Sequence, residues 1–406
     1  MRHRTGFALC FILGLLAWSC SKEPNSPSSD GSPSETDGRT DIYNDDTYLN
    51  TDNTDLNDSV IVDPPGVGKR SGLQAFSMKL IAQINPPKVS KQSVQATSVS
   101  LNGSYAYISY NMVGNPYLGA IDVVSISGSK ARTVSRATFT DTDVSSVVYF
   151  NNKVYLAEAT SSVMFYPPAT IEVLKLTSGK LTLKGNYRGQ LTSYVATCAA
   201  AENGKIYATT GNAGGLFTLT QDSLKFVAYT PLTDARWVDT DANDVVVVQG
   251  GGKLSTFDIN TGSLLNTYTF TGTGIAESKS TVRVLGGKAL IAAGDGGVVL
   301  MNLATGKVVG SIPRTIVSGL DPSLSVTNAV DASGQYIYIS NGEAGVYVAQ
   351  ASQALENLSG DTPITLTVLG KLRFSNQQSV NHVAFNGSTL VIASGLGGVK
   401  VVTVTF

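Results

Sequence analysis

The chain has 406 residues, of which 29 are lysine or arginine and 30 are aspartate or glutamate, so its formal net charge is −1. This length is enough for a large buried core, and three cysteines are too few for the disulfide framework of a small secreted scaffold. The basic residues are spread thinly along the chain, which argues against a nucleic-acid-binding protein and predicts no nucleic-acid partner.

The first residues have the layout of an export signal. Arg2 and Arg4 precede an apolar run, residues 7–18, that is too short for a comfortable membrane span. The run ends in Ala-Trp-Ser before Cys20, which resembles the cleavage box of bacterial lipoproteins. The resemblance implies a signal peptide over residues 1–19 and lipid on Cys20. The alternative is an ordinary secretory signal followed by an incidental cysteine.

The residues directly after Cys20 suggest a destination. Ser-Lys-Glu in this place resembles the export signal of surface lipoproteins in Bacteroidota-type bacteria. The resemblance implies a protein anchored in the outer membrane by its lipid, with its folded part at the cell surface. The outer membrane is therefore the expected partner of Cys20.

A low-complexity segment follows the signal. Residues 20–68 are rich in Ser, Asp, Asn, Thr and Pro, and they hold too few large apolar side chains to offset the entropy of ordering. The aspartates within 41–63 lack the glycine and the closing glutamate of a calcium loop. We therefore predict a disordered acidic tether over 20–68, no metal site, and a folded domain over 69–406.

The folded domain repeats one small unit, seen most clearly in residues 286–307. Two apolar, β-branched runs are separated by glycine pairs, as in a tight hairpin. Turn-forming pairs precede each copy at an average spacing of about 47 residues, which is typical of propeller blades of four strands. These pairs are Asn102-Gly103, Asn151-Asn152, Asn203-Gly204, Ala242-Asn243, Gly286-Gly287, Ser333-Gly334 and Asn386-Gly387.

Six units have four strands, whereas the seventh ends with its third strand, residues 399–406. The missing strand is available at 77–85, which resembles the fourth strands of the other units. We therefore predict an all-β, seven-bladed β-propeller whose ring is closed by the N-terminal strand 77–85, which hides two sheet edges. A solenoid or a pair of sandwiches is the competing architecture.

The repeats, as in residues 390–404, resemble the LVIVD-type propeller repeats of bacterial surface proteins. Most copies depart from that pattern because they lack its closing aspartate, which Asp258 keeps. The resemblance implies a propeller at the cell surface and implies no particular chemistry.

Catalytic and cofactor motifs are absent from the sequence. His382 is the one histidine outside the signal, no Gly-x-Ser-x-Gly elbow accompanies it, and no His or Cys spacing fits zinc. The glycine-rich stretches lie between strands and open no helix, so phosphate binding is not expected. We predict no cofactor. An isolated histidine on a strand is more often structural than catalytic.

One face of the predicted disc carries two unusually long loops. The second-to-third strand loops of the first two blades are long and apolar, and we predict that they form an aromatic and thioether patch. The alternative is that these loops pack on each other. The candidate binding residues are Tyr110, Met112, Tyr117, Met164, Phe165 and Tyr166, with Tyr194, Arg236, Trp237 and His382 near the same face or the axis.

The inner strands also share a polar column that is expected to face a water-filled axis. Its members are Thr97, Ser146, Cys198, Thr281, Asn328 and Asn381. Trp237 falls beside this column, where burial between blades is more expected than ligand stacking.

These observations favour a binding module for a glycan, a peptide or a protein partner. The alternative is an extracellular glycan hydrolase or lyase that uses Asp143, Glu277 or Asp321 as acid or base. A third possibility is a structural subunit of a surface complex.

Overall fold

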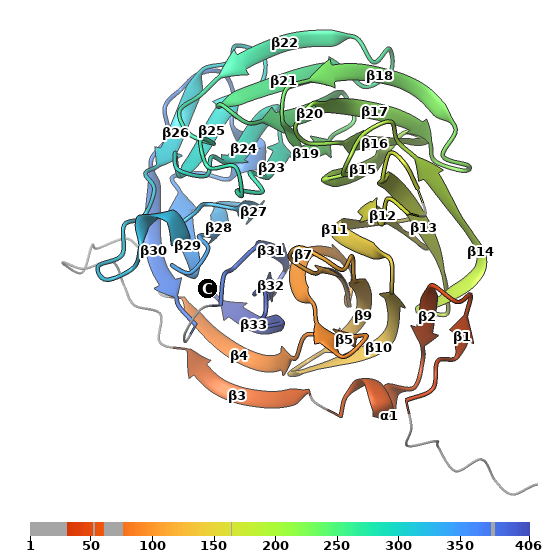
Figure 1. Cartoon of the computed structure of the whole chain (residues 1–406). Helices are drawn as coiled ribbons and strands as arrows, with labels where there is room; N and C mark the ends of the chain where they lie inside the picture. The colour runs from red at the N-terminus through yellow and green to blue at the C-terminus, as the bar shows by residue number, and fades with distance from the viewer. Residues whose placement is uncertain (1–30, 52, 61–75, 164, 375–377) are drawn as a thin grey trace, which may run out of the picture.

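The computed structural model describes residues 31–51, 53–60, 76–163, 165–374 and 378–406. It has seven antiparallel sheets arranged in a ring, as Figure 1 shows. The prediction of an all-β, seven-bladed propeller is confirmed. Over the described parts of the chain, no helix has the length and apolar character that crossing a bilayer requires.

Each blade has four strands, which run outward from the axis in chain order in every blade except the last. The inner strands are β7 (Gln95–Asn102), β11 (Thr142–Phe150), β15 (Cys198–Glu202), β19 (Ala235–Thr240), β23 (Val282–Leu285), β27 (Ala329–Ser333) and β31 (His382–Asn386). The second strands are β8 (Tyr105–Asn111), β12 (Lys153–Thr160), β16 (Lys205–Thr209), β20 (Asp244–Gln249), β24 (Lys288–Ala292), β28 (Tyr336–Ser340) and β32 (Thr389–Ala393).

The outer half of each blade completes the sheet. The third strands are β9 (Gly119–Ser127), β13 (Ala169–Thr177), β17 (Gly214–Thr220), β21 (Lys253–Asp258), β25 (Val298–Asn302), β29 (Val346–Ala351) and β33 (Val399–Thr405). The outer strands are β10 (Lys130–Phe139), β14 (Lys180–Gln190), β18 (Phe226–Leu232), β22 (Leu264–Thr269), β26 (Val308–Ile312), β30 (Leu366–Leu372) and β4 (Ser77–Ile84). The short elements β5 (Lys88–Val89), β6 (Gln92–Ser93), η1 (Pro322–Leu324) and η2 (Leu355–Asn357) lie in connections.

Three of the seven turn pairs have positive φ at both residues, three have it at the glycine alone, and Ala242-Asn243 has it at neither. Asn151 and Asn152 have φ angles of 49° and 56°, and Asn203 and Gly204 have φ angles of 50° and 72°. Positive φ at both central residues matches the right-handed twist of the flanking strands. These turns therefore set the register between the first and second strands.

The ring closes where the sequence predicts. β4 pairs antiparallel with β33, from Val399 opposite Ile84 to Thr405 opposite Ser77. The last blade is thus built from both ends of the domain, and neither β33 nor β4 is left without a neighbour on that side.

The core lies between blades. The described residues form seven apolar clusters, and each cluster joins two neighbouring blades around the whole ring. In one of them, Tyr207 and Leu216 of the third blade pack with Val238 and Val247 of the fourth. Every blade is therefore held by apolar burial on both of its faces.

The expectation of a disordered tether over 20–68 is wrong for its described part. β1 (Glu35–Thr36) and β2 (Thr40–Tyr43) form a hairpin that adds to β10, α1 (Asp46–Leu49) follows, and β3 (Thr54–Val60) adds to β4. Figure 1 shows these elements along the outside of the ring. The segment has few apolar residues, but the propeller supplies the strand edges with which its backbone pairs. Residues 20–30 and 61–68 lie outside the described part.

Arg39, at the tip of this hairpin, enters a charged cluster of the second blade. Its guanidinium donates to both carboxylate oxygens of Glu172, at 3.1 and 3.0 Å, and its Nε donates to Asp141 at 3.0 Å. Arg188 lies 3.2 Å from Glu172 on the other side. Burial, and then the charge of Glu172, raises the pKa of Glu158 well above its ordinary value, which favours its neutral form. With Glu158 neutral, the cations Arg39 and Arg188 face the carboxylates of Glu172 and Asp141.

We expect Arg39→Met to lower the free energy of unfolding by about 3 kcal/mol, because the buried Glu172 then keeps only Arg188 and the partly buried Asp141 loses its contact with Arg39. Urea unfolding measures this change. Arg132→Met is the matched control, since the pair of Arg132 with Asp55 is exposed and should contribute much less to stability. Equal losses in the two variants would contradict a structural role for the hairpin.

Candidate functional site

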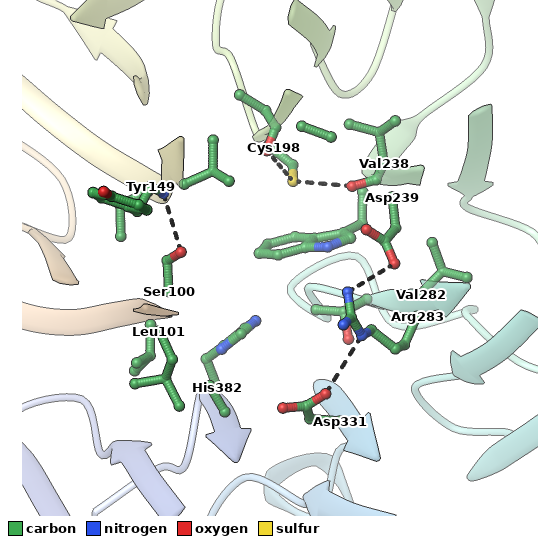
Figure 2. Close-up of a pocket in the computed structure, with 18 of the residues that line it drawn as sticks. Ser100, Leu101, Tyr149, Cys198, Val238, Asp239, Val282, Arg283, Asp331 and His382 are labelled. Carbon is green, nitrogen blue, oxygen red and sulfur yellow. Dashed lines mark hydrogen bonds and ion pairs between the residues drawn. The ribbon is translucent and has the colours of Figure 1, made fainter. Parts of the chain in front are cut away.

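A central pocket of about 390 Å³ lies around the axis. All seven inner strands line it, with residues two to six positions before the second residue of each first-to-second strand turn, so it opens toward the face that carries these turns. This is the face opposite the long loops that the sequence singled out. Figure 2 shows side chains of several blades converging on the pocket.

Three side chains close the axis beneath the pocket. The rings of Trp237 and His382 stack with their centroids 5.3 Å apart, and the Lys279 ammonium lies 5.9 Å from the Trp237 ring. Lys279 also donates to the carbonyl of Ser145 at 3.1 Å, which links the fifth blade to the second. Burial lowers the pKa of Lys279 to about 8. Trp237 is therefore covered by both neighbours and serves as part of the floor.

His382 is buried, with 9% of its surface exposed, and it also lines the pocket. Its Nδ1 has no hydrogen-bond partner in the described structure. Burial, and then the charge of Lys279, lowers its pKa to about 3, so the imidazole is neutral at pH 7. A buried nitrogen without a partner costs free energy unless a ligand or water satisfies it. Figure 2 shows this ring reaching toward the middle of the pocket.

Arg283 forms the opposite wall, between two carboxylates (Figure 2). Its guanidinium lies 3.5 Å from Asp239 and 3.6 Å from Asp331, which are long contacts for charged hydrogen bonds. Its side chain is 47% exposed. Because the guanidinium has five N–H donors and both contacts are long, it keeps donors for a ligand in the pocket.

The two carboxylates are held by the neighbouring blades. Asp239 accepts the N–H of Val284 at 2.8 Å, and Asp331 accepts the N–H of Phe385 at 2.7 Å. Burial raises the pKa of both groups, against the effect of Arg283. The pocket thus offers a guanidinium, two fixed carboxylates and a neutral imidazole nitrogen. Among the residues that the structure describes, no three His, Cys, Asp or Glu side chains gather as a metal site would require.

The predicted loop patch is mostly internal. Tyr110 is fully buried and donates to Asp122 at 2.9 Å, and Met112 packs against the core. Tyr117 is half-buried, and Phe165 covers the guanidinium of Arg188 at 4.7 Å. These loops fold back because their apolar side chains find partners within the blades. Met164 and Cys20 lie outside the described residues.

Two tyrosines on that face do remain accessible. Tyr166 is 71% exposed and Tyr194 is 61% exposed, and a hydrogen bond between them raises the pKa of Tyr166. Arg236, by contrast, is buried and donates to Asp234 at 2.7 Å and to the carbonyl of Ile275 at 2.7 Å. Of the predicted site residues, the structure brings together Trp237 and His382 at the axis.

The carboxylates proposed for catalysis are separate and have local roles. Asp143 accepts the N–H groups of Met112 and Leu118, which fixes the first long loop, and burial raises its pKa to about 6. Asp321 accepts the N–H and the hydroxyl of Ser323, and these bonds lower its pKa. Glu277 is exposed in the connection before β23. They belong to different blades.

Arg283, Asp239 and Asp331 were missed in the sequence. The sequence pattern could have pointed to Arg283 and Asp239. In each of their strands, the residue lies two positions after the one that is in register with the predicted polar column. Side chains two apart on a strand share a face. The column also joins blades: Asn381 donates to the carbonyl of Ala96 at 2.9 Å, and Thr281, which lines the pocket with Cys198, accepts the N–H of Val330 at 3.0 Å.

Comparisons with known proteins bear on the fold alone. No family model and no curated protein matches the sequence, so the LVIVD-type resemblance remains a prediction. The chain is similar to BamB from Moraxella catarrhalis over 87% of its own length and 98% of that chain, with 16% identity and a TM-score of 0.48. It is similar to the computationally designed Ika8 protein over 86% and 100%, with 14% identity and a TM-score of 0.47.

The buried His382 predicts a specific pH dependence. Its folded pKa lies below its unfolded value, so the unfolded chain alone takes up this proton as the pH falls through 6.5, and the folded state loses stability. His382→Gln removes this uptake. Between pH 7 and pH 5, the free energy of unfolding of the wild type should therefore fall by about 2 kcal/mol more than that of His382→Gln.

Denaturant unfolding of both chains at pH 7 and pH 5 measures the difference in their free energies of unfolding. All other titrating groups are common to both chains, so their effects cancel to first order. If this difference in free energy of unfolding is the same at both pH values, the neutral, buried state of the imidazole is contradicted.

Proposed function

We propose that this chain is a binding protein that takes a neutral, hydroxyl-rich ligand, such as a sugar unit of a glycan, in its central pocket. The observation that carries the proposal is the guanidinium of Arg283, which lines the pocket with its side chain 47% exposed and makes only long contacts with Asp239 and Asp331. A volume of about 390 Å³ lies in the range of small-ligand sites.

The mixture of charges favours a neutral ligand. A hydroxyl group both donates and accepts, so it can accept from Arg283 and donate to Asp239, Asp331 or the imidazole nitrogen of His382. An anionic ligand would meet the two carboxylates and the nearby Glu202, which also lines the pocket. A cationic ligand would meet Arg283. Vicinal hydroxyls satisfy both kinds of group at once.

Binding is better supported than hydrolysis. Asp239 and Asp331 line the pocket, but each already accepts a backbone N–H of the next blade and faces Arg283. A general acid or base must be free to exchange its proton with the substrate. These bonds instead hold the carboxylates in place as fixed acceptors.

We also propose that the propeller is held at the outer membrane, facing the cell surface, by lipid on Cys20. The basic start, the short apolar run and the residues around Cys20 support this. Incorporation of labelled palmitate that is lost in Cys20→Ala tests the anchor, and equal labelling of both chains would contradict it.

The ligand proposal predicts saccharide binding that depends on Arg283. Isothermal titration of the mature chain from residue 20, with Cys20→Ser, against common monosaccharides and disaccharides should find at least one that binds at the pocket. Arg283→Lys keeps the charge but loses the planar fork of donors, so affinity should fall at least about tenfold.

Arg132→Lys is the matched control, because Arg132 lies on the outer rim and pairs with Asp55. It should bind as wild type does. Thermal unfolding of each variant reports whether it is folded. No binding by any saccharide, or equal binding by folded Arg283→Lys, would contradict the proposal.

A further inference from the structure

Over the described part of the chain, the central pocket has a closed floor. Two contacts that run across the ring, rather than between neighbouring blades, form this floor. Lys279, which precedes the fifth blade, donates to the carbonyl of Ser145 in the second blade at 3.1 Å. Trp237 of the fourth blade stacks on His382 of the seventh. The pocket therefore ends at this floor and does not continue to the face of the long loops.

The walls of the pocket are continuous, so its opening lies on the other face. All seven inner strands line it, which leaves no gap between blades at the side. The described connections between first and second strands are only two or three residues long, from 103–104 in the first blade to 241–243 in the fourth. By contrast, the connection 112–118 on the opposite face is seven residues long. A ligand can therefore enter and leave the pocket only past the short turns.

The pocket has a polar side and an apolar side. Asp239, Arg283 and Asp331 come from the fourth, fifth and sixth blades, which are neighbours in the ring. The seventh, first and second blades contribute mostly apolar residues, among them the half-buried Phe385 and Leu101. Figure 2 shows Leu101 across the pocket from Arg283. A sugar ring has hydroxyls around its edge and C–H groups on its faces, so two unlike walls favour one orientation of the ring.

We propose that the pocket, if it binds saccharides as proposed for it, takes the terminal unit of a saccharide chain and not a unit from the middle. A middle unit carries two glycosidic bonds, and both of its neighbours would have to leave through the same opening. A terminal unit carries one such bond, which can point out of the opening while the rest of the ring contacts walls and floor. Because the two walls differ, one end of the chain should fit and the other end should not.

Isothermal titration of the mature chain with Cys20→Ser tests this proposal in two steps. The first step titrates glucose, galactose, mannose and N-acetylglucosamine and identifies a sugar that binds. The second step uses three trisaccharides that carry this sugar at the non-reducing end, in the middle or at the reducing end. One of the two end-placed forms should bind within about threefold of the free sugar, and the middle-placed form at least about tenfold more weakly.

Two tetrasaccharides provide a matched control for size. A fourth unit added to the end of the trisaccharide that occupies the pocket should abolish binding, because the sugar then becomes a middle unit. The same unit added to the other end should leave the affinity unchanged, because that end lies outside the opening. The two tetrasaccharides have the same number of units, so a difference between them reports which end enters the pocket.

Three results of the second step would overturn the proposal: equal binding of the middle-placed and end-placed trisaccharides, no binding of either end-placed form, or equal binding of the two tetrasaccharides. All three leave the saccharide-binding function itself intact, because a sugar has then already bound in the first step. If none of the four sugars binds in the first step, the saccharide-binding function fails for them, and the end-on inference falls with it.

Discussion

The structure depends on the pairing of β4 with β33. A propeller blade is a small sheet that exposes an apolar surface on each face, so an open row of blades would leave two of these surfaces in water. The seven apolar clusters form an unbroken ring only because the last blade, built from both ends of the domain, packs on the first. Closure also joins the blades around an axis, and the central pocket exists for that reason.

Polar groups inside the ring have a consistent role. Carboxylates and hydroxyls of one blade accept backbone N–H groups of the next, as Ser100 does from Tyr149 at 3.1 Å and Asp331 does from Phe385. A buried polar group needs a hydrogen-bond partner, and each of these bonds provides one for the backbone N–H and one for the side-chain oxygen. Groups that stay unsatisfied therefore stand out. Among the described residues these include Ser146 and His382, and His382 lines the pocket together with Arg283, whose contacts with Asp239 and Asp331 are long.

The sequence was sufficient for the architecture because the information is local and repeated. Turn pairs such as Asn203-Gly204 require positive φ, and the strands between them alternate in the expected way. The borrowed strand 77–85 could be predicted because the seventh unit lacked one. Residues 31–60 could not be assigned in the same way, because their pairing partners belong to the propeller and Arg39 finds its carboxylates more than one hundred residues away.

The site was harder to predict for a related reason. Aromatic loop residues such as Tyr110 look exposed in sequence, but their burial depends on Asp122 and on neighbouring strands. Asp239, Arg283 and Asp331 come from three different blades, and only ring geometry brings them together. Trp237 and His382 lie at the axis on different blades, and their mutual stacking follows from the closed ring.

Disulfide trapping across the closing strand pair tests the central claim most directly. Lys79 lies opposite Thr403 in the pairing of β4 with β33, and both positions are at least partly exposed. The variant Lys79→Cys with Thr403→Cys should form an intramolecular disulfide readily in the folded protein. The variant Lys79→Cys with Thr389→Cys should not, because Thr389 lies on β32, one strand further away. Failure of the first pair to cross-link, or equal cross-linking of both pairs, would contradict a ring closed by β4.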